Sequence, residues 1–173
     1  MTTFVSFQGG QVLLAGSDNR ITLYDADSQK RQRSFVEKNY LAHAYTSFAM
    51  VGGGGNSNGS SSSSRSSGGK RRNSGGGDGG DELLAIGCSD GTIILWNLVT
   101  GMADKVLGNA NESPVPTDLA FSNDGNSLFV SSQSSVVQYS VKDGALVQAL
   151  KAGKHGALKL AMNPKAAVLA IAG

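Results

Sequence analysis

The side chains of this 173-residue chain that could perform chemistry are few and widely spaced. Its only cysteine is Cys88, and its two histidines are His43 and His155. None of them has a partner at the spacing typical of a nucleophile and its general base. Together they supply too few ligands for a zinc site, and a single cysteine excludes an internal disulfide. We therefore predict no catalytic residue, no metal site, no bound cofactor and no enzyme activity.

One short segment offers a different kind of chemistry. Lys70, Arg71 and Arg72 are adjacent cations, with Arg65 before them and Ser74 after them. Such cations can contact nucleic-acid phosphates without reading the base sequence. They could also form a nuclear-import signal, or place Ser74 before a kinase that prefers basic sites, where a phosphate would largely cancel the positive charge. These interpretations stay open beside a plainer one, an expandable surface loop.

The cations belong to a block, residues 52–80, whose composition differs from the rest. Its 29 positions hold 12 glycines and 9 serines and no apolar or aromatic side chain, so we predict a disordered insert. The stretch GGGDGGDELL lacks the Gly-Lys-Ser/Thr ending of a phosphate-binding loop. Outside the block, 11 basic and 12 acidic groups leave a net charge of −1. Any electrostatic attraction to nucleic acid therefore depends on the four cations of the block.

The elements that must position these residues are almost all strands. Short runs rich in Val, Ile, Leu, Phe and Thr lie between Gly, Asn, Asp and Ser, which is typical of strands and turns. Ser89-Asp90-Gly91 and Asn123-Asp124-Gly125 are tight-turn sequences. Residues 158–162 and 166–172 could be helical by propensity, but their context favours strands. The predicted fold class is all-β, with the clearest strands at residues 12–15, 21–24, 83–88, 92–96, 128–131 and 136–141.

The longest apolar run, at residues 166–172, has seven residues, whereas a membrane-spanning helix needs about 20. The N-terminal sequence MTTFVSFQGGQ lacks the charged start and continuous apolar stretch of a signal peptide. We therefore expect an intracellular protein.

Three segments repeat one another: GSDNRITLYD (16–25), GCSDGTIILWN (87–97) and SSQSSVVQYS (131–140). Trp96 and Tyr139 are 43 positions apart, and so are Tyr24 and Trp96 once the 29-residue block is removed. A fourth copy begins at residues 158–173, where VLAIA echoes LLAIG. A period of about 43 residues with four short strands matches a β-propeller blade.

We therefore predict one domain, residues 1–173, that forms an incomplete propeller of about three and a half four-stranded blades. Its units are approximately residues 1–35, 36–107, 108–150 and 151–173. In the second unit we expect strands at 45–51, 83–88, 92–97 and 103–107, with the insert between the first two.

The stretch SDGTIILWN, followed by LVTG, resembles the third strand and exit turn of a WD repeat, and AFSNDGNSLFVSS (120–132) resembles the first two strands. The resemblance implies a buried polar network of His43, Asp90 and Trp96 in the second unit, with Asp18 in the first. The chain also departs from the family. Ile86 or Gly87 stands where the network needs a hydroxyl, Gln133 replaces the aspartate of the third unit, and the usual Trp-Asp pair is Tyr24-Asp25, Trp96-Asn97 or Tyr139-Ser140.

A finer resemblance concerns the first two units. Phe35-Val36, Ala42-His43, the cations at 70–72 and residues 83–87 are arranged as in the N-terminal propeller of the nucleolar WD-repeat subunit of the small-subunit processome, in its early transcription-linked subcomplex. This similarity implies a scaffold in early 18S ribosomal RNA maturation, located in the nucleolus or nucleus rather than the cytoplasm. Its implied partners are other proteins of a multi-subunit complex and pre-ribosomal RNA, with no membrane and no small-molecule substrate.

Two other functions stay open. One is a general WD-repeat adaptor in ubiquitin ligation, trafficking or signalling. The other is a propeller enzyme, against which the missing catalytic residues argue. Because propellers close at four to eight blades, we also expect this chain to be the N-terminal part of a longer protein or a truncated gene model. An open apolar edge would make it poorly soluble alone.

Overall fold

The computed structural model describes residues 4–8, 11–15, 20–36, 44–51, 82–109, 111–151, 156–163 and 165–173. In these ranges the regular secondary structure consists of strands, so the predicted all-β class is confirmed. The strands are β1 (Phe4–Gln8), β2 (Gln11–Ala15), β3 (Arg20–Asp25), β4 (Arg31–Val36), β5 (Tyr45–Val51), β6 (Leu83–Cys88), β7 (Ile93–Asn97), β8 (Met102–Leu107), β9 (Asp118–Phe121), β10 (Ser127–Ser131), β11 (Ser135–Ser140), β12 (Leu146–Lys151), β13 (Lys159–Met162) and β14 (Leu169–Ala172).

The strands lie close to the predicted positions. β5 and β6 have the predicted bounds, β7 begins one residue later than expected and β8 one residue earlier. The two C-terminal segments whose propensity also allowed helix contain β13 and β14, which confirms the preference for strands there. Short apolar runs bounded by turn residues were therefore a sufficient signal.

The strands form sheets in the order of the chain. Three sheets have four strands each, in the orders β1-β2-β3-β4, β5-β6-β7-β8 and β9-β10-β11-β12, and β13 pairs with β14 in a two-stranded sheet. Every pairing is antiparallel, so neighbouring strands are joined as consecutive hairpins. We call the four sheets sheet 1 to sheet 4.

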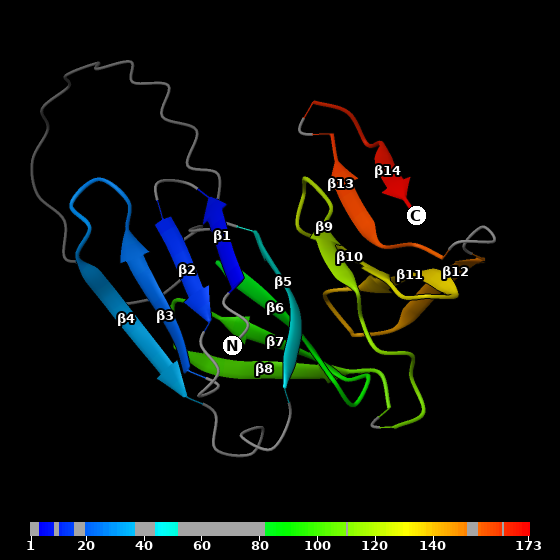
Figure 1. Cartoon of the computed structure of the whole chain (residues 1–173), viewed down its shortest axis with the longest axis horizontal. Coiled ribbons are helices and arrows are strands. Elements are labelled where there is room, and N and C mark those ends of the chain that lie inside the picture. Colours follow the sequence, from blue (N-terminus) through cyan, green and yellow to red (C-terminus); the bar gives the residue numbers. More distant parts are fainter. Residues whose placement is uncertain are drawn as a thin grey trace, which may run out of the picture.

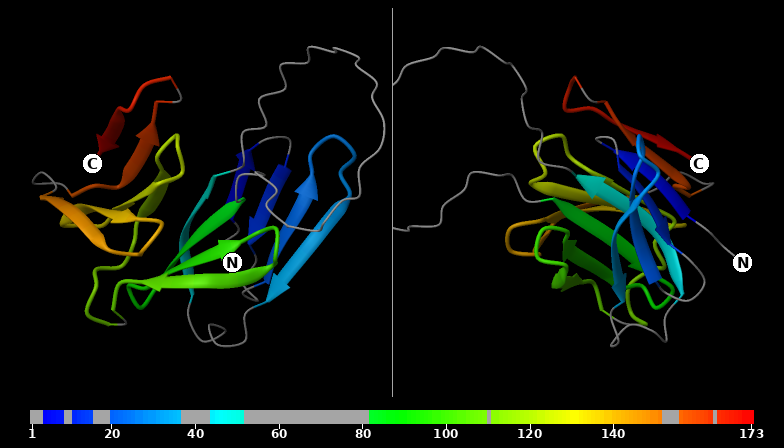
Figure 2. Two further views of the ribbon diagram at one scale, coloured as in Figure 1. Left: turned by 180° about the vertical axis from the view of Figure 1, so that it is seen from behind. Right: turned by 90° about the vertical axis from the view of Figure 1, so that its left-hand side faces the viewer.

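The sheets are stacked through their first strands. β1 contacts β5, β5 contacts β9, and β9 contacts β13. Figure 1 shows these first strands toward the middle of the molecule, with β4, β8 and β12 at the periphery. The view from behind in Figure 2 keeps the same arrangement. Each sheet thus has an inner strand beside its neighbours and an outer strand toward solvent.

The first three sheets pack against one another through two apolar cores. The core between sheets 1 and 2 joins Phe35 to Trp96, whose ring centroids are 5.7 Å apart. The core between sheets 2 and 3 contains Leu95, Leu107 and Leu128. Because sheet 2 contributes to both cores, β6 and β7 are buried on both faces, which explains why LLAIGC and IILWN show no alternation of polar and apolar residues.

Several predictions concern residues outside the described ranges. These are the insert at 52–80, with Arg65, Lys70, Arg71, Arg72 and Ser74, and the residues Asp18, His43 and His155. In the ranges that the structure describes, no helix has the length and apolar character needed to cross a membrane.

Candidate functional site

The predicted polar network has two members in the described part of the chain, Asp90 and Trp96. Asp90 lies in the turn between β6 and β7, where its Oδ1 accepts hydrogen bonds from the backbone N (3.1 Å) and the Oγ1 (2.6 Å) of Thr92. Gly91, in the same turn, has φ = 88°, which disfavours other residues. Asp90 therefore orders this turn and fixes the start of β7.

Trp96 is 2% exposed and packs against Phe35 of sheet 1. Its indole Nε1 is buried and has no hydrogen-bond partner among the described residues. In the WD pattern a hydroxyl on the second strand belongs to the same polar network as the tryptophan. Here Gly87, which has no side chain, stands near the end of that strand. A Cβ at Gly87 would lie 2.4 Å from Ser47 Oγ and 2.9 Å from Pro116 Cβ, so those side chains already fill the space.

The third sheet holds a different polar contact at the equivalent position. Ser131 pairs with Val136 as Gly87 pairs with Ile93, so Ser131 is the counterpart of Gly87. Ser131 Oγ lies 2.9 Å from Thr117 Oγ1, in a hydrogen bond, and Thr117 Oγ1 donates to the carbonyl of Ala157 (2.8 Å). This contact links sheet 3 to the segment before sheet 4.

Sequence reasoning missed this link, because Thr117 lies outside the repeated segments. The only signal was Ser131 at the place where the family carries its hydroxyl.

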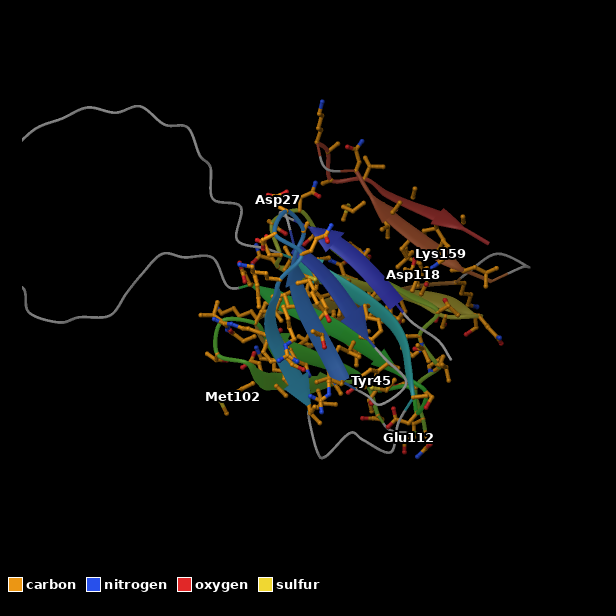
Figure 3. The ribbon with its side chains drawn as sticks, turned by 60° about the vertical axis from the view of Figure 1, so that its left-hand side comes forward. Asp27, Tyr45, Met102, Glu112, Asp118 and Lys159 are labelled. Carbon is orange, nitrogen blue, oxygen red and sulfur yellow. The ribbon has the colours of Figure 1, made fainter. Side chains whose placement is uncertain are left out.

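A second link between sheets 3 and 4 lies at Asp118, the first residue of β9. Its Oδ2 accepts a hydrogen bond from the backbone N of Leu160 (2.9 Å), and its Oδ1 lies 3.7 Å from Lys159 Nζ. Figure 3 shows Asp118 and Lys159 side by side on neighbouring strands. Because the Lys159 side chain is 75% exposed, the ion pair adds little to stability. The hydrogen bond from the backbone N of Leu160 is therefore the stronger interaction between the two strands.

The residue after the aromatic of each third strand orders the turn to the fourth strand. Asp25 Oδ1 accepts hydrogen bonds from the N (2.7 Å) and the Oγ (2.6 Å) of Ser28, and these bonds lower the pKa of Asp25. Asn97 Oδ1 accepts from the N of Val99 (2.9 Å) and of Thr100 (3.0 Å). The amide of Asn97 thus orders its turn as the carboxylate of Asp25 does.

In the third sheet Ser140 takes that place, and the carboxylate lies three residues later. A hydrogen bond with the Ser140 side chain is the main cause that lowers the pKa of Asp143, whose Oδ1 also accepts from the N of Ala145 (3.3 Å). The departure from Trp-Asp at Tyr139-Ser140 is therefore compensated within the same turn.

Sheet 1 is held to sheet 2 by two side chains of its fourth strand. On β4, Arg33 Nη1 donates to the carbonyls of Leu98 and Val99, the latter at 2.9 Å. Phe35 lies next to Gly101, where a Cβ would be 3.1 Å from its ring. We call this pair of contacts the outer clamp of sheet 1.

The same clamp recurs on sheet 2. Lys105 Nζ donates to the carbonyl of Val141 (3.1 Å), and a Cβ at Gly144 would lie 2.9 Å from Leu107 Cδ2. Lys105 pairs with Leu95 as Arg33 pairs with Leu23, so the two cations occupy equivalent positions. The two interfaces between the four-stranded sheets are therefore built alike.

Cys88 is fully buried at the end of β6, and burial raises the pKa of its thiol to about 11. The thiol therefore stays protonated at neutral pH, where only the thiolate is a good nucleophile. Within the described residues, no three His, Cys, Asp or Glu side chains are grouped so that they could hold a metal ion.

No protein-family model and no curated protein matches this chain. The resemblance to WD repeats therefore depends on the repeated segments at residues 16–25, 87–97 and 131–140 and on the stretch 120–132.

Proposed function

We propose that the chain is a non-catalytic scaffold for protein assembly, built as a section of a WD-type β-propeller. The observation that supports this best is the repetition of the outer clamp. Phe35 and Leu107 lie against Gly101 and Gly144, and the two glycines are 43 residues apart, which is the period of the repeat. A conserved spacing with a conserved contact is what stacked repeats of one unit require.

The arrangement of the sheets also supports a propeller. In this architecture four-stranded sheets surround an axis with their first strands innermost. Here β1, β5, β9 and β13 lie beside one another in sequence order, and the fourth strands lie outside. WD-repeat propellers, which this chain resembles, are binding platforms, so scaffolding is the function class that fits this chain best.

For the cellular role we propose early small-subunit ribosome biogenesis in the nucleolus, with other proteins of a multi-subunit complex as partners. The support is the resemblance of residues 35–36, 42–43, 70–72 and 83–87 to the nucleolar WD-repeat subunit of the small-subunit processome. Outside the insert the net charge is −1, so contact with pre-ribosomal RNA would be made by Lys70, Arg71 and Arg72.

The test is affinity purification and fluorescence imaging of the tagged full chain in its source cell. We expect nucleolar fluorescence and co-purification of small-subunit assembly proteins. Reversal of Lys70, Arg71 and Arg72 to Glu should weaken recovery of RNA and leave protein partners bound. The matched control reverses Lys30, Arg31 and Lys142, which are exposed cations of the folded part, and should change neither.

Two outcomes would contradict the nucleolar role. The tagged chain could be absent from the nucleolus, or it could recover components of a ubiquitin ligase, a trafficking coat or a signalling complex instead. The second outcome would support the general adaptor, which the near-neutral charge of the folded part also fits.

A further inference from the structure

The loop that joins β8 to β9 carries a serine followed by a proline, Ser113-Pro114. The three prolines of the chain follow Ser113, Val115 and Asn163, so no other serine or threonine precedes a proline. Proline has no backbone N–H, and it disfavours a helical backbone at the residue before it. Proline-directed serine kinases select this pair, because their binding cleft takes an extended substrate and offers no acceptor for an N–H after the serine. The pair therefore indicates one class of modifying enzyme.

Ser113 lies at the surface of the molecule. It is half-buried, while Glu112, Pro114 and Val115 beside it are exposed, Val115 by 45%. Figure 3 shows Glu112 at the lower edge of the molecule. The Ser113 Oγ accepts a hydrogen bond from the backbone N of Asn109 (2.9 Å) in an exposed position. Because water can replace this bond at little cost, the hydroxyl can be released to an enzyme.

In its unmodified form Ser113 holds the loop against the turn between β6 and β7. A Cβ at Gly108 would lie 3.1 Å from the Ser113 Oγ, and a Cβ at Gly91 would lie 3.2 Å from the Ser113 Cβ. The backbone N of Asn111 donates a hydrogen bond to the carbonyl of Asp90 in that turn (2.6 Å). The serine side chain therefore fits between two glycines, where a phosphoryl group would not.

The charges near Ser113 in the sequence would also oppose a phosphate. Glu112 precedes it, and the Glu112 Oε2 accepts a hydrogen bond from Asn109 Nδ2 (3.0 Å) within the same loop. From residue 73 to residue 141 the sequence has one cation, Lys105, and its Nζ already donates to the carbonyl of Val141 (3.1 Å). A phosphate beside a carboxylate and without a cationic partner disrupts the local structure rather than ordering it.

We propose that Ser113 is a phosphorylation site for a proline-directed serine kinase, and that its phosphate releases the loop from the turn between β6 and β7. The Ser113 Oγ attacks the γ-phosphorus of ATP held by the kinase, and a new O–P bond forms. The bond from the γ-phosphorus to the β,γ-bridging oxygen breaks, ADP leaves with the electron pair, and the hydroxyl proton passes to a carboxylate of the kinase. The proposal goes beyond the scaffold function, because it describes the control of one surface loop in whichever complex the chain belongs to.

Ser74 is a candidate for a different class of kinase. The cations before it, Lys70, Arg71 and Arg72, suit a kinase that prefers basic sites, and Gly75 follows it instead of a proline. A proline-directed kinase should therefore modify Ser113 and leave Ser74 unmodified, so that one reaction distinguishes the two serines.

The test uses the folded full chain, a purified cyclin-dependent kinase and ATP radiolabelled at the γ-phosphate, and mass spectrometry locates the phosphate. Ser113→Ala removes the acceptor hydroxyl. Pro114→Ala keeps that hydroxyl but restores an N–H after it. The matched control is Ser134→Ala, at an exposed serine in the turn between β10 and β11 that Ser135 follows. Far-UV circular dichroism checks that each variant is folded.

We expect about one phosphate per chain, at Ser113, with incorporation about tenfold lower or more in Ser113→Ala and Pro114→Ala and within about twofold of the original in Ser134→Ala. Absence of phosphate at Ser113 in the folded chain, or an unchanged rate in Pro114→Ala, would overturn the proposal. Phosphorylation that occurs only after denaturation would overturn it as well, because the surface position of the loop would then have no part in it.

The release of the loop is measured by amide hydrogen exchange followed by nuclear magnetic resonance. The N–H groups of Asn109 and Asn111, which donate to Ser113 Oγ and to the carbonyl of Asp90, should exchange about tenfold faster or more after phosphorylation. The N–H of Thr117, which donates to the carbonyl of Ser131 (2.8 Å) at the other end of the loop, should change by less than about twofold. Unchanged exchange at Asn109 and Asn111 in the phosphorylated chain would contradict the release.

Discussion

Three turns of this chain each contain one residue in the left-handed conformation, a glutamine in one turn and a glycine in the other two. Replacing the glutamine by glycine and replacing a glycine by alanine should change the free energy of unfolding in opposite directions. The residues are Gln29 (φ = 55°), Gly101 (φ = 73°) and Gly144 (φ = 73°). Each lies four positions after the residue that follows the aromatic of its third strand. The turns are therefore equivalent, but only two of them have the residue that this conformation favours.

The magnitudes follow from two opposing terms. A left-handed conformation destabilises the folded state by about 1–2 kcal/mol when the residue has a Cβ. Glycine avoids this cost, but it increases the entropy of the unfolded chain, which lowers the free energy of unfolding by about 0.4–1 kcal/mol. Gln29→Gly should therefore raise the free energy of unfolding by about 0.5–1 kcal/mol. Gly144→Ala should lower it by about 1–3 kcal/mol, because its Cβ would also lie 2.9 Å from Leu107 Cδ2.

The assay is urea unfolding followed by the fluorescence of Trp96, the only tryptophan, which is buried between sheets 1 and 2. Gln29→Ala is the control: alanine bears the same left-handed cost as glutamine, so the change should stay within about 0.5 kcal/mol. If Gln29→Gly destabilised the chain, or Gly144→Ala left it unchanged, the equivalence of the turns would be refuted.

Other positions give further predictions. Ser47→Ala should raise the free energy of unfolding by up to about 1 kcal/mol, because it removes a buried hydroxyl that has no hydrogen-bond partner among the described residues. Ser131→Ala should lower the free energy of unfolding by about 1–2 kcal/mol, because the Ser131 hydroxyl is hydrogen-bonded. Urea titration measures both changes, and changes of equal sign would contradict this difference in hydrogen bonding. Arg33→Ala and Lys105→Ala should each cost about 1 kcal/mol and add in the double variant, since they belong to different interfaces; a strongly non-additive urea result would disprove this. The buried Cys88 thiol should react with a disulfide reagent only as the chain unfolds. The free energy of unfolding should fall by up to about 1.4 kcal/mol per pH unit between pH 9.0 and about 11, because in this range the thiol loses its proton in the unfolded state before it does so in the folded state. Cys88→Ala should remove that part of the pH dependence, and an unchanged slope would show that another group causes it.

The strands were predictable because each is a short apolar run between turn residues, and the 43-residue spacing placed them in register. The segment containing β6 and β7 shows this best, since β6 has no polar side chain, β7 has only its last residue, Asn97, and the turn Ser89-Asp90-Gly91 lies between them. The stacking of the sheets was predictable only through the period, because no single segment records which strand lies beside β5.

The outer clamps were not predictable from the sequence. Arg33 and Leu98 are 65 residues apart, and Lys105 and Val141 are 36 apart, and the acceptors are backbone carbonyls that carry no side-chain signal. Gln29 also hides its turn, because glutamine is not a residue that a left-handed conformation favours. The need for glycine at position 87 was not predictable either, because it comes from the neighbouring side chains of Ser47 and Pro116, which fill the space of a Cβ.

The central claim is that equivalent residues make equivalent contacts in successive stacked sheets. Nuclear Overhauser effects between the Phe35 ring and the Gly101 α-protons, and between the Leu107 methyl groups and the Gly144 α-protons, test it most directly. We expect both sets, since a Cβ at these glycines would lie 3.1 Å and 2.9 Å from the two side chains. Effects at Gly101 without effects at Gly144, or the absence of both, would contradict the repeated stack and the scaffold proposed from it.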